Sequence, residues 1–198
     1  MAVWRHLNST LRHVCRLRTV AALSCDRRGV AALEFALLAP FLLTALIGLV
    51  AISQAVRAKM LLTSTASSMA SMVAAQHTVT GGSSGTLRDL CNGAQLIMRP
   101  YAAGALSIAI TSYTKQSDST VLRDWEYDGA CQASAGSLAA TGVTLASPLL
   151  VDAGDSIIIT RASYNYMSLY TNIVPNMMLS QTAYARPRYG TVTCTIYC

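Results

Sequence analysis

Hydrophobic positions along the 198-residue chain begin with a long and almost unbroken run. It extends from Val30 to Ile52, and Glu34 is its single charged residue. At about 1.5 Å per residue, a helix of this length spans roughly 35 Å, enough to cross a hydrocarbon core of about 30 Å. The run therefore predicts a transmembrane helix over residues 30–52.

Beyond Ile52 the pattern becomes amphipathic. Small and aliphatic residues recur every three or four positions and define one stripe, which comprises Val56, Met60, Thr63, Ala66, Ala70 and Val73. We expect one continuous helix over 30–76, whose extension at 53–76 packs this stripe against a globular domain. Two helices with a hinge near Ser53 are the alternative.

Residues 77–198 change period from helical to alternating. Glycine and serine at 81–85 indicate a break, and a shorter helix is expected from Leu87 to Pro100, with Thr86 as its N-cap. Alternation predicts a hairpin of two strands, 106–111 and 121–127, and a second pair, 156–169 and 177–188. Residues 130–154, rich in alanine, serine and glycine, give no clear prediction. The fold class is α+β, with a long N-terminal transmembrane helix leading into a domain with a small antiparallel sheet.

The net charge of +6 is concentrated before the apolar run. Six of the fifteen basic residues precede Val30, namely Arg5, Arg12, Arg16, Arg18, Arg27 and Arg28. The remainder carries nine basic and eight acidic residues, so the charge gives no support for a nucleic-acid partner. By the positive-inside rule, we expect the basic leader 1–29 to stay cytoplasmic and the C-terminal domain to be exported.

The cysteines also fall into two groups, one before and one after the apolar run. Two lie in the leader and four in the exported part, an even number that suits an oxidising compartment. Of the three possible pairings we favour Cys194 with Cys198, which are close in sequence, and Cys91 with Cys131, which then close a long loop. Free buried thiols are the alternative.

Candidate chemistry is sparse. Residues 124–129 imitate the first half of a calcium loop, but the twelfth position is Ala135 instead of the glutamate that would bind in bidentate fashion. A strand with its acids on one face and Trp125 and Tyr127 on the other explains the pattern better. His77 is the only histidine after the leader, and no nucleophile and base pair stands out. We therefore predict no catalytic, cofactor-binding or metal-binding residues, and interpret Met60, Met69 and Met72 as packing residues.

A family resemblance rests on the start of the apolar run. Basic residues end at Gly29, Val30 begins the run, and Glu34 and Phe35 stand at its fifth and sixth positions. This arrangement resembles the type IV pilin-like processing site, and GVAALEFALLAPFLL looks like the start of TadE-like proteins, minor pseudopilins of tight-adherence (Flp-type) pilus systems. SIIITRASYNYMSL and LSQTAYARPRY are similar to the C-terminal pair of strands in that family. The long leader and the cysteine-flanked end, 194–198, depart from the pattern.

The resemblance implies a non-enzymatic, pilin-like minor subunit of the bacterial inner membrane. It would be cut after Gly29 by a prepilin peptidase and would assemble with other pilin or pseudopilin subunits in pilus formation or secretion. A carboxylate inside lipid is costly unless it is paired, and the new α-amino group on Val30 of a neighbouring subunit is a natural partner for Glu34. The alternative is an uncleaved signal anchor carrying a periplasmic ligand-binding or enzymatic domain. The C-terminal tyrosines suit either a subunit contact surface or the core.

Overall fold

A computed structural model describes residues 30–128, 131, 136–196 and 198. The chain divides into two compact units, with the boundary between Val50 and Ala51. The predicted leader, 1–29, lies outside the described residues.

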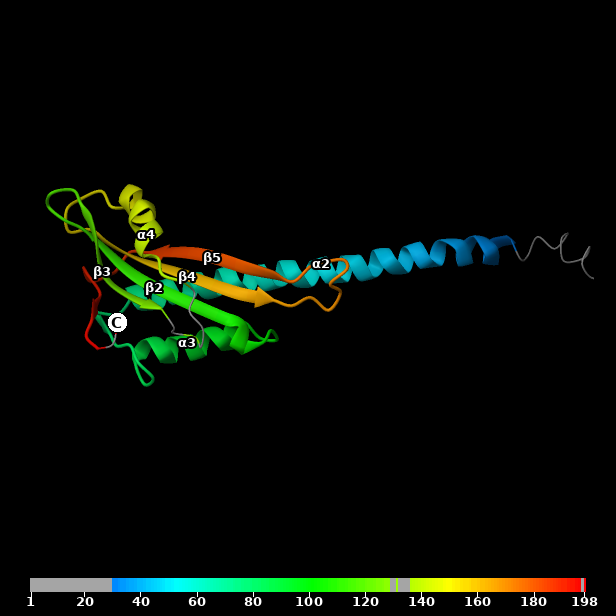
Figure 1. Cartoon of the computed structure of the whole chain (residues 1–198), viewed down its shortest axis with the longest axis horizontal. Coiled ribbons are helices and arrows are strands. Elements are labelled where there is room, and N and C mark those ends of the chain that lie inside the picture. Colours follow the sequence, from blue (N-terminus) through cyan, green and yellow to red (C-terminus); the bar gives the residue numbers. More distant parts are fainter. Residues whose placement is uncertain (1–29, 129–130, 132–135, 197) are drawn as a thin grey trace, which may run out of the picture. The chain divides into compact units, whose positions relative to one another are not determined.

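Helix α2 runs from Val30 to Ala74 as a single α-helix (Figure 1). It continues through Ser53 without a break, so the continuous-helix prediction is confirmed, although the helix ends two residues before Gln76. Pro40 lies inside it and is tolerated. Because proline lacks an N–H group, the helix loses one backbone hydrogen bond there.

The second unit is built on a four-stranded antiparallel sheet in the order β3-β2-β4-β5 (Figure 1). The strands are β2 (Leu106–Lys115), β3 (Val121–Asp128), β4 (Ser156–Tyr166) and β5 (Met177–Ala185). Both predicted strand pairs form, and β2 also pairs with β4, with Ile110 opposite Thr160. The predicted α+β class with a small antiparallel sheet is confirmed.

One face of the sheet packs on the second-unit part of α2 and on α3 (Thr86–Ile97). The sheet contributes alternate residues such as Ile108, Ile110 and Ile158, while α2 contributes Ala58, Leu62 and Ala66. Alternate residues of a strand share a face, so the spacing of these residues explains the common core.

The stripe predicted on α2 is right in its second half and wrong in its first. Ala66, Ala70 and Val73 are buried, but Val56, Met60 and Thr63 are exposed. In the first half of this segment the buried residues are instead Ala51, Ala58 and Leu62. Of the methionines interpreted as packing residues, Met69 is buried, whereas Met60 and Met72 are exposed. Several small residues fit a helical period on this segment, so spacing alone did not select the packed face.

Helix α3 begins one residue earlier than a cap at Thr86 would require, so the N-cap prediction is wrong. The N-cap residue is Gly85, and Thr86 is the first helical residue. Thr86 instead accepts a hydrogen bond from the Thr80 N–H group at 2.9 Å, and its own N–H group donates to the Thr80 hydroxyl group at 3.0 Å. A Cβ atom at position 85 would collide with the Gly81 carbonyl oxygen, so close packing requires glycine there.

Helix α4 (Ala139–Ala146) and the 3₁₀ turn η3 (Ser147–Leu149) form within the segment that gave no clear prediction. They pack over one end of the other sheet face, where Tyr113, Ile157 and Ile159 are buried. The Tyr113 hydroxyl group donates to the Leu138 carbonyl oxygen at 3.0 Å. A Cβ atom at Gly142 would collide with that hydroxyl group, so glycine permits α4 to approach the tyrosine.

The C-terminal segment adds a strand that the sequence did not predict. Strand β6 (Thr193–Cys194) pairs in parallel with β1 (Thr78–Val79), and the Gly81 N–H group donates to the Ile196 carbonyl oxygen at 2.8 Å. The buried indole N–H group of Trp125 donates to the Val192 carbonyl oxygen at 2.7 Å. The end of the chain is therefore held beside β3.

Candidate membrane anchor and assembly site

The first unit presents an apolar surface along α2. Large side chains on all sides of the helix are exposed, including Leu33, Phe35, Leu37, Phe41, Leu42, Leu46 and Leu49. A helix buried in a protein core would cover such side chains, whereas a helix in lipid leaves them outward. Among the described residues, α2 is the one helix long and apolar enough to cross a membrane. Its length, composition and exposure suit a membrane anchor.

Glu34 and Phe35, the predicted assembly residues, both lie exposed in the second turn of α2. Glu34 is the only charged residue from Val30 to Val56, and Arg57 is the next. The helix can cover its own backbone polar groups but not this carboxylate. The position of Glu34 is thus the one place on the anchor with an electrostatic reason to take a partner.

The structure describes only one of the two residues of the predicted processing site. Gly29 lies outside the described residues, and Val30 is the first residue of α2. Scission between them would leave a chain that starts at the first turn of the anchor helix. The cleavage remains a prediction.

The four cysteines that follow the apolar run form two disulfides in the structure, in the pairing that the sequence analysis favoured. Cys91 of α3 is bonded to Cys131, with 5.5 Å between their Cα atoms, and both residues are buried. Cys194 is bonded to Cys198, with 6.2 Å between the Cα atoms. The first disulfide links α3 to the segment after β3, and the second closes the C-terminal turn.

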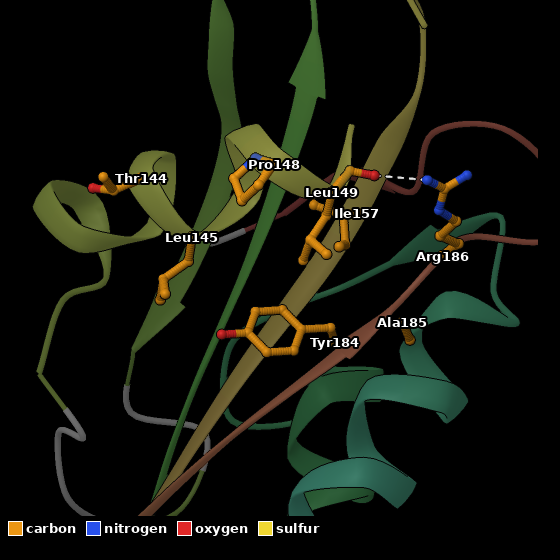
Figure 2. Close-up of a pocket in the computed structure, with 8 residues that line it drawn as sticks. All are labelled: Thr144, Leu145, Pro148, Leu149, Ile157, Tyr184, Ala185 and Arg186. Carbon is orange, nitrogen blue, oxygen red and sulfur yellow. Dashed lines mark hydrogen bonds between the residues drawn. The ribbon is translucent and has the colours of Figure 1, made fainter. Parts of the chain in front are cut away.

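A pocket of about 480 Å³ lies on the α4 side of the sheet (Figure 2). Its floor comes from Ile157 of β4 and from Tyr184 and Ala185 of β5, and its wall comes from α4 and η3. The wall residues are Thr144, Leu145, Pro148 and Leu149. Arg186 stands at the rim, and one of its guanidinium nitrogens donates to the Leu149 carbonyl oxygen at 2.6 Å. The sequence missed this site because the segment of α4 carried no clear pattern.

Asp155 organises the turn beside this pocket. Its Oδ2 atom accepts hydrogen bonds from the N–H groups of Asp152, at 3.2 Å, and Val151, at 3.1 Å. These two bonds, with smaller help from the charges of Arg186 and Lys115, lower the pKa of Asp155 below its ordinary value. The Arg186 guanidinium lies 3.9 Å from the same oxygen and is largely exposed, so this ion pair contributes little.

Some of the tyrosines lie in the core and others are exposed, and a contact role for the exposed ones stays a prediction. Tyr113, Tyr164 and Tyr166 are buried in the core, and burial raises the pKa of the first two. Tyr170, Tyr184 and Tyr189 are exposed. The ring of Tyr189 stacks on His77, with 4.2 Å between the ring centroids.

Other side chains with possible chemistry have structural contacts. Asp124 accepts hydrogen bonds from Ser112 at 2.9 Å and from Thr114 at 2.7 Å, within the strand pair that the alternation predicted. Glu126 accepts from the Leu138 N–H group and pairs with Arg123. In the described part of the chain, no cluster of three potential metal ligands occurs.

An exposed apolar helix that continues into a small α+β domain defines a class of protein, a domain carried on a potential membrane anchor. The family comparison narrows this class. The sequence model of the family described as TadE-like protein matches residues 29–71, which span the anchor and most of the packed part of α2. No curated protein and no solved structure matches the chain. The resemblance at the start of the apolar run is confirmed, whereas the similarity of residues 156–189 stays a prediction.

Proposed function

We propose that the chain is a minor pilin-like subunit of tight-adherence pilus assembly or the related secretion machinery, processed by a prepilin peptidase and without enzymatic activity. The observation that carries the proposal is the coincidence of three features at one place. The TadE-like match begins at residue 29, the anchor helix begins at Val30, and its surface is apolar apart from Glu34.

Glu34 would direct assembly. In an isolated subunit its carboxylate is costly in lipid, because charge is poorly solvated there. Scission after Gly29 would create an α-amino group on Val30, and this cation of one subunit would neutralise Glu34 of its neighbour. Opposite charges attract strongly in a medium of low dielectric constant, so the benefit arises only in the assembled state.

The subunit would lie in the bacterial inner membrane with its C-terminal domain in the periplasm. The arginines of the leader and the two disulfides support this orientation. Alkaline phosphatase fused after Cys198 should therefore be active. A cytoplasmic reporter that is active at the same point, with inactive phosphatase, would reverse the orientation.

N-terminal sequencing of the membrane-extracted protein tests processing directly. We expect the mature chain to begin at Val30. Gly29→Leu should keep the full-length chain, while Gly48→Leu, the same change within the anchor, should still be cut. A wild-type chain that begins at Met1 would favour the uncleaved signal-anchored domain instead.

Glu34→Gln tests the assembly role, since it removes the charge and keeps the size of the side chain. Expression, membrane insertion and both disulfides should be unchanged, but co-purification with other pilus components should fall. Protease resistance of the periplasmic domain is measured in parallel. Normal co-purification would show that Glu34 has no part in assembly, and lost protease resistance would place its role in folding.

A further inference from the structure

Strand β5 forms an outer edge of the four-stranded sheet (Figure 1). Its nine residues, Met177–Ala185, pair with β4 in an unbroken register from Tyr166 opposite Met177 to Ile158 opposite Ala185. Among the described residues, no backbone hydrogen bond joins β5 to any other segment. The other edge differs, because the C-terminal segment is held beside β3 through Trp125 and Val192.

The sequence of β5 lacks the features that normally protect a sheet edge. It reads MMLSQTAYA, with no charged residue and no proline, and its pairing with β4 contains no bulge. Proteins usually block exposed edges with charges, prolines, bulges or short strands, because the unpaired N–H and C=O groups accept another strand. An unprotected edge of nine residues is therefore suited to pairing with an extended segment.

The apolar pocket lies at the C-terminal end of this edge. Tyr184 and Ala185 of β5 line it, and Arg186 follows directly (Figure 2). In recognition by strand addition, backbone hydrogen bonds supply affinity, and pockets that receive alternate side chains supply specificity. The edge and the pocket provide these two parts side by side.

The charges near the β5 edge indicate which kind of segment would bind there. From Ser156 to Cys198 the chain has three basic residues, Arg161, Arg186 and Arg188, and no acidic residue. Arg186 is exposed, and its contact with Asp155, at 3.9 Å, is long. A carboxylate on the occupant would give Arg186 a closer, charge-assisted hydrogen bond.

We propose that the β5 edge and the adjoining pocket bind an extended segment of a partner protein. The segment carries a large apolar side chain that fills the pocket and, two positions away on the same face, an acidic side chain that pairs with Arg186. Residues two apart in a strand point to the same face, which sets this spacing. The inference goes beyond the proposed function and does not depend on processing or on the membrane anchor.

A second copy of the chain fits the edge less well. Antiparallel self-pairing centred on Gln181 would place Asn176 opposite Arg186, and the neighbouring strand would bring no acidic residue. The arginines would thus stay unneutralised. A partner with a different, acidic sequence would neutralise the positive charge of these arginines, which a second copy would not.

Binding of short peptides to the full chain in detergent micelles tests the proposal. The probes are nine-residue peptides of alternating threonine and valine that contain leucine and aspartate two positions apart, in either order, to allow both strand directions. Matched peptides carry lysine in place of aspartate. Fluorescence anisotropy should show that one of the acidic peptides binds at least about tenfold more tightly than its lysine counterpart, as expected for one charge-assisted hydrogen bond.

Two variants and one mapping experiment make the test specific. Arg186→Glu should reverse the preference in favour of the lysine peptide, while Arg99→Glu, an equal charge change at an exposed site after α3, should leave it unaltered. Amide hydrogen exchange should show added protection in 177–186 and none in 121–128. The proposal is overturned if neither of the two acidic peptides binds, if Arg186→Glu keeps the original preference for the acidic peptide, or if the added protection falls outside 177–186. Protection of β5 that rises with protein concentration alone would assign the edge to a second copy and also overturn it.

Discussion

The two parts of α2 use hydrophobic residues in opposite ways. From Leu33 to Val50 many apolar side chains are large and exposed, whereas from Ala51 to Ala74 one face of the helix is buried against the domain. The buried set of the second part is rich in alanine, with Ala58, Ala66 and Ala70 fully covered. Small residues let a sheet approach the helix closely, whereas the large residues of the first part present an exposed apolar surface.

This difference shows that apolar character alone does not identify a protein core. Leucine and phenylalanine dominate the part that the domain does not cover, and alanine marks the part that it does cover. The second part buries its apolar side chains against the domain, whereas lipid is the partner that we propose for the first part. Substitutions of the same type in the two parts should therefore have unequal effects on the domain.

The largest loss of stability should follow removal of the disulfide between Cys91 and Cys131, which lies within the domain. Replacing Cys91 and Cys131 by alanine opens a loop of 40 residues, and the chain-entropy relation gives a loss of about 4 kcal/mol in the free energy of unfolding. Alanine at Cys194 and Cys198, which close a loop of four residues, should cost about 2 kcal/mol. Urea unfolding in detergent, followed by near-UV circular dichroism, measures both. Equal losses would contradict the chain-entropy account.

Leucine truncation compares the two parts of the helix directly. Leu62 is 0% exposed and Leu42 is 61% exposed. Leu62→Ala should destabilise the domain by about 3 kcal/mol, because it removes buried methyl groups and leaves a cavity. Leu42→Ala should leave the midpoint of urea unfolding of the domain unchanged. A comparable loss at Leu42 would mean that the anchor packs on protein in the isolated chain.

Asp155→Asn should have the smallest effect, and the effect should depend on pH. Folding lowers the pKa of Asp155 from its ordinary value of 3.8, so its contribution to stability is complete above that value and is lost as pH falls through the lower folded pKa. The midpoints of the wild-type and variant proteins should differ slightly at neutral pH and converge in acid. A difference that grows in acid would contradict the sign of the shift.

The sequence predicted the elements that have a sustained period. The apolar run, α2 and both strand pairs follow from hydrophobic spacing, whereas the assembly role of Glu34 stays a prediction. It did not select the buried face of α2, because Val56, Met60 and Thr63 fit the helical period as well as Ala58 and Leu62 do. Tertiary packing makes that choice.

Elements defined by long-range contacts were also missed. Strand β6 is two residues long and forms because the end of the chain pairs with β1. The paired residues, such as Thr78 and Thr193, are 115 positions apart in the sequence. The pocket depends on α4, whose alanine-rich and serine-rich surroundings have no clear period, and on its contact with β4 and β5. Local pattern contains no information about which distant segments meet.

Labelling of two engineered cysteines on α2 tests the central claim most directly. Leu46 and Met60 are 57% and 66% exposed, so both would react in water. In a chain with Cys15 and Cys25 replaced by serine, Met60→Cys should react with a membrane-impermeant maleimide added to spheroplasts. Leu46→Cys should stay unlabelled, because lipid covers it. Equal labelling at the two positions in intact membranes would contradict the prediction of residues 30–52 as a membrane anchor.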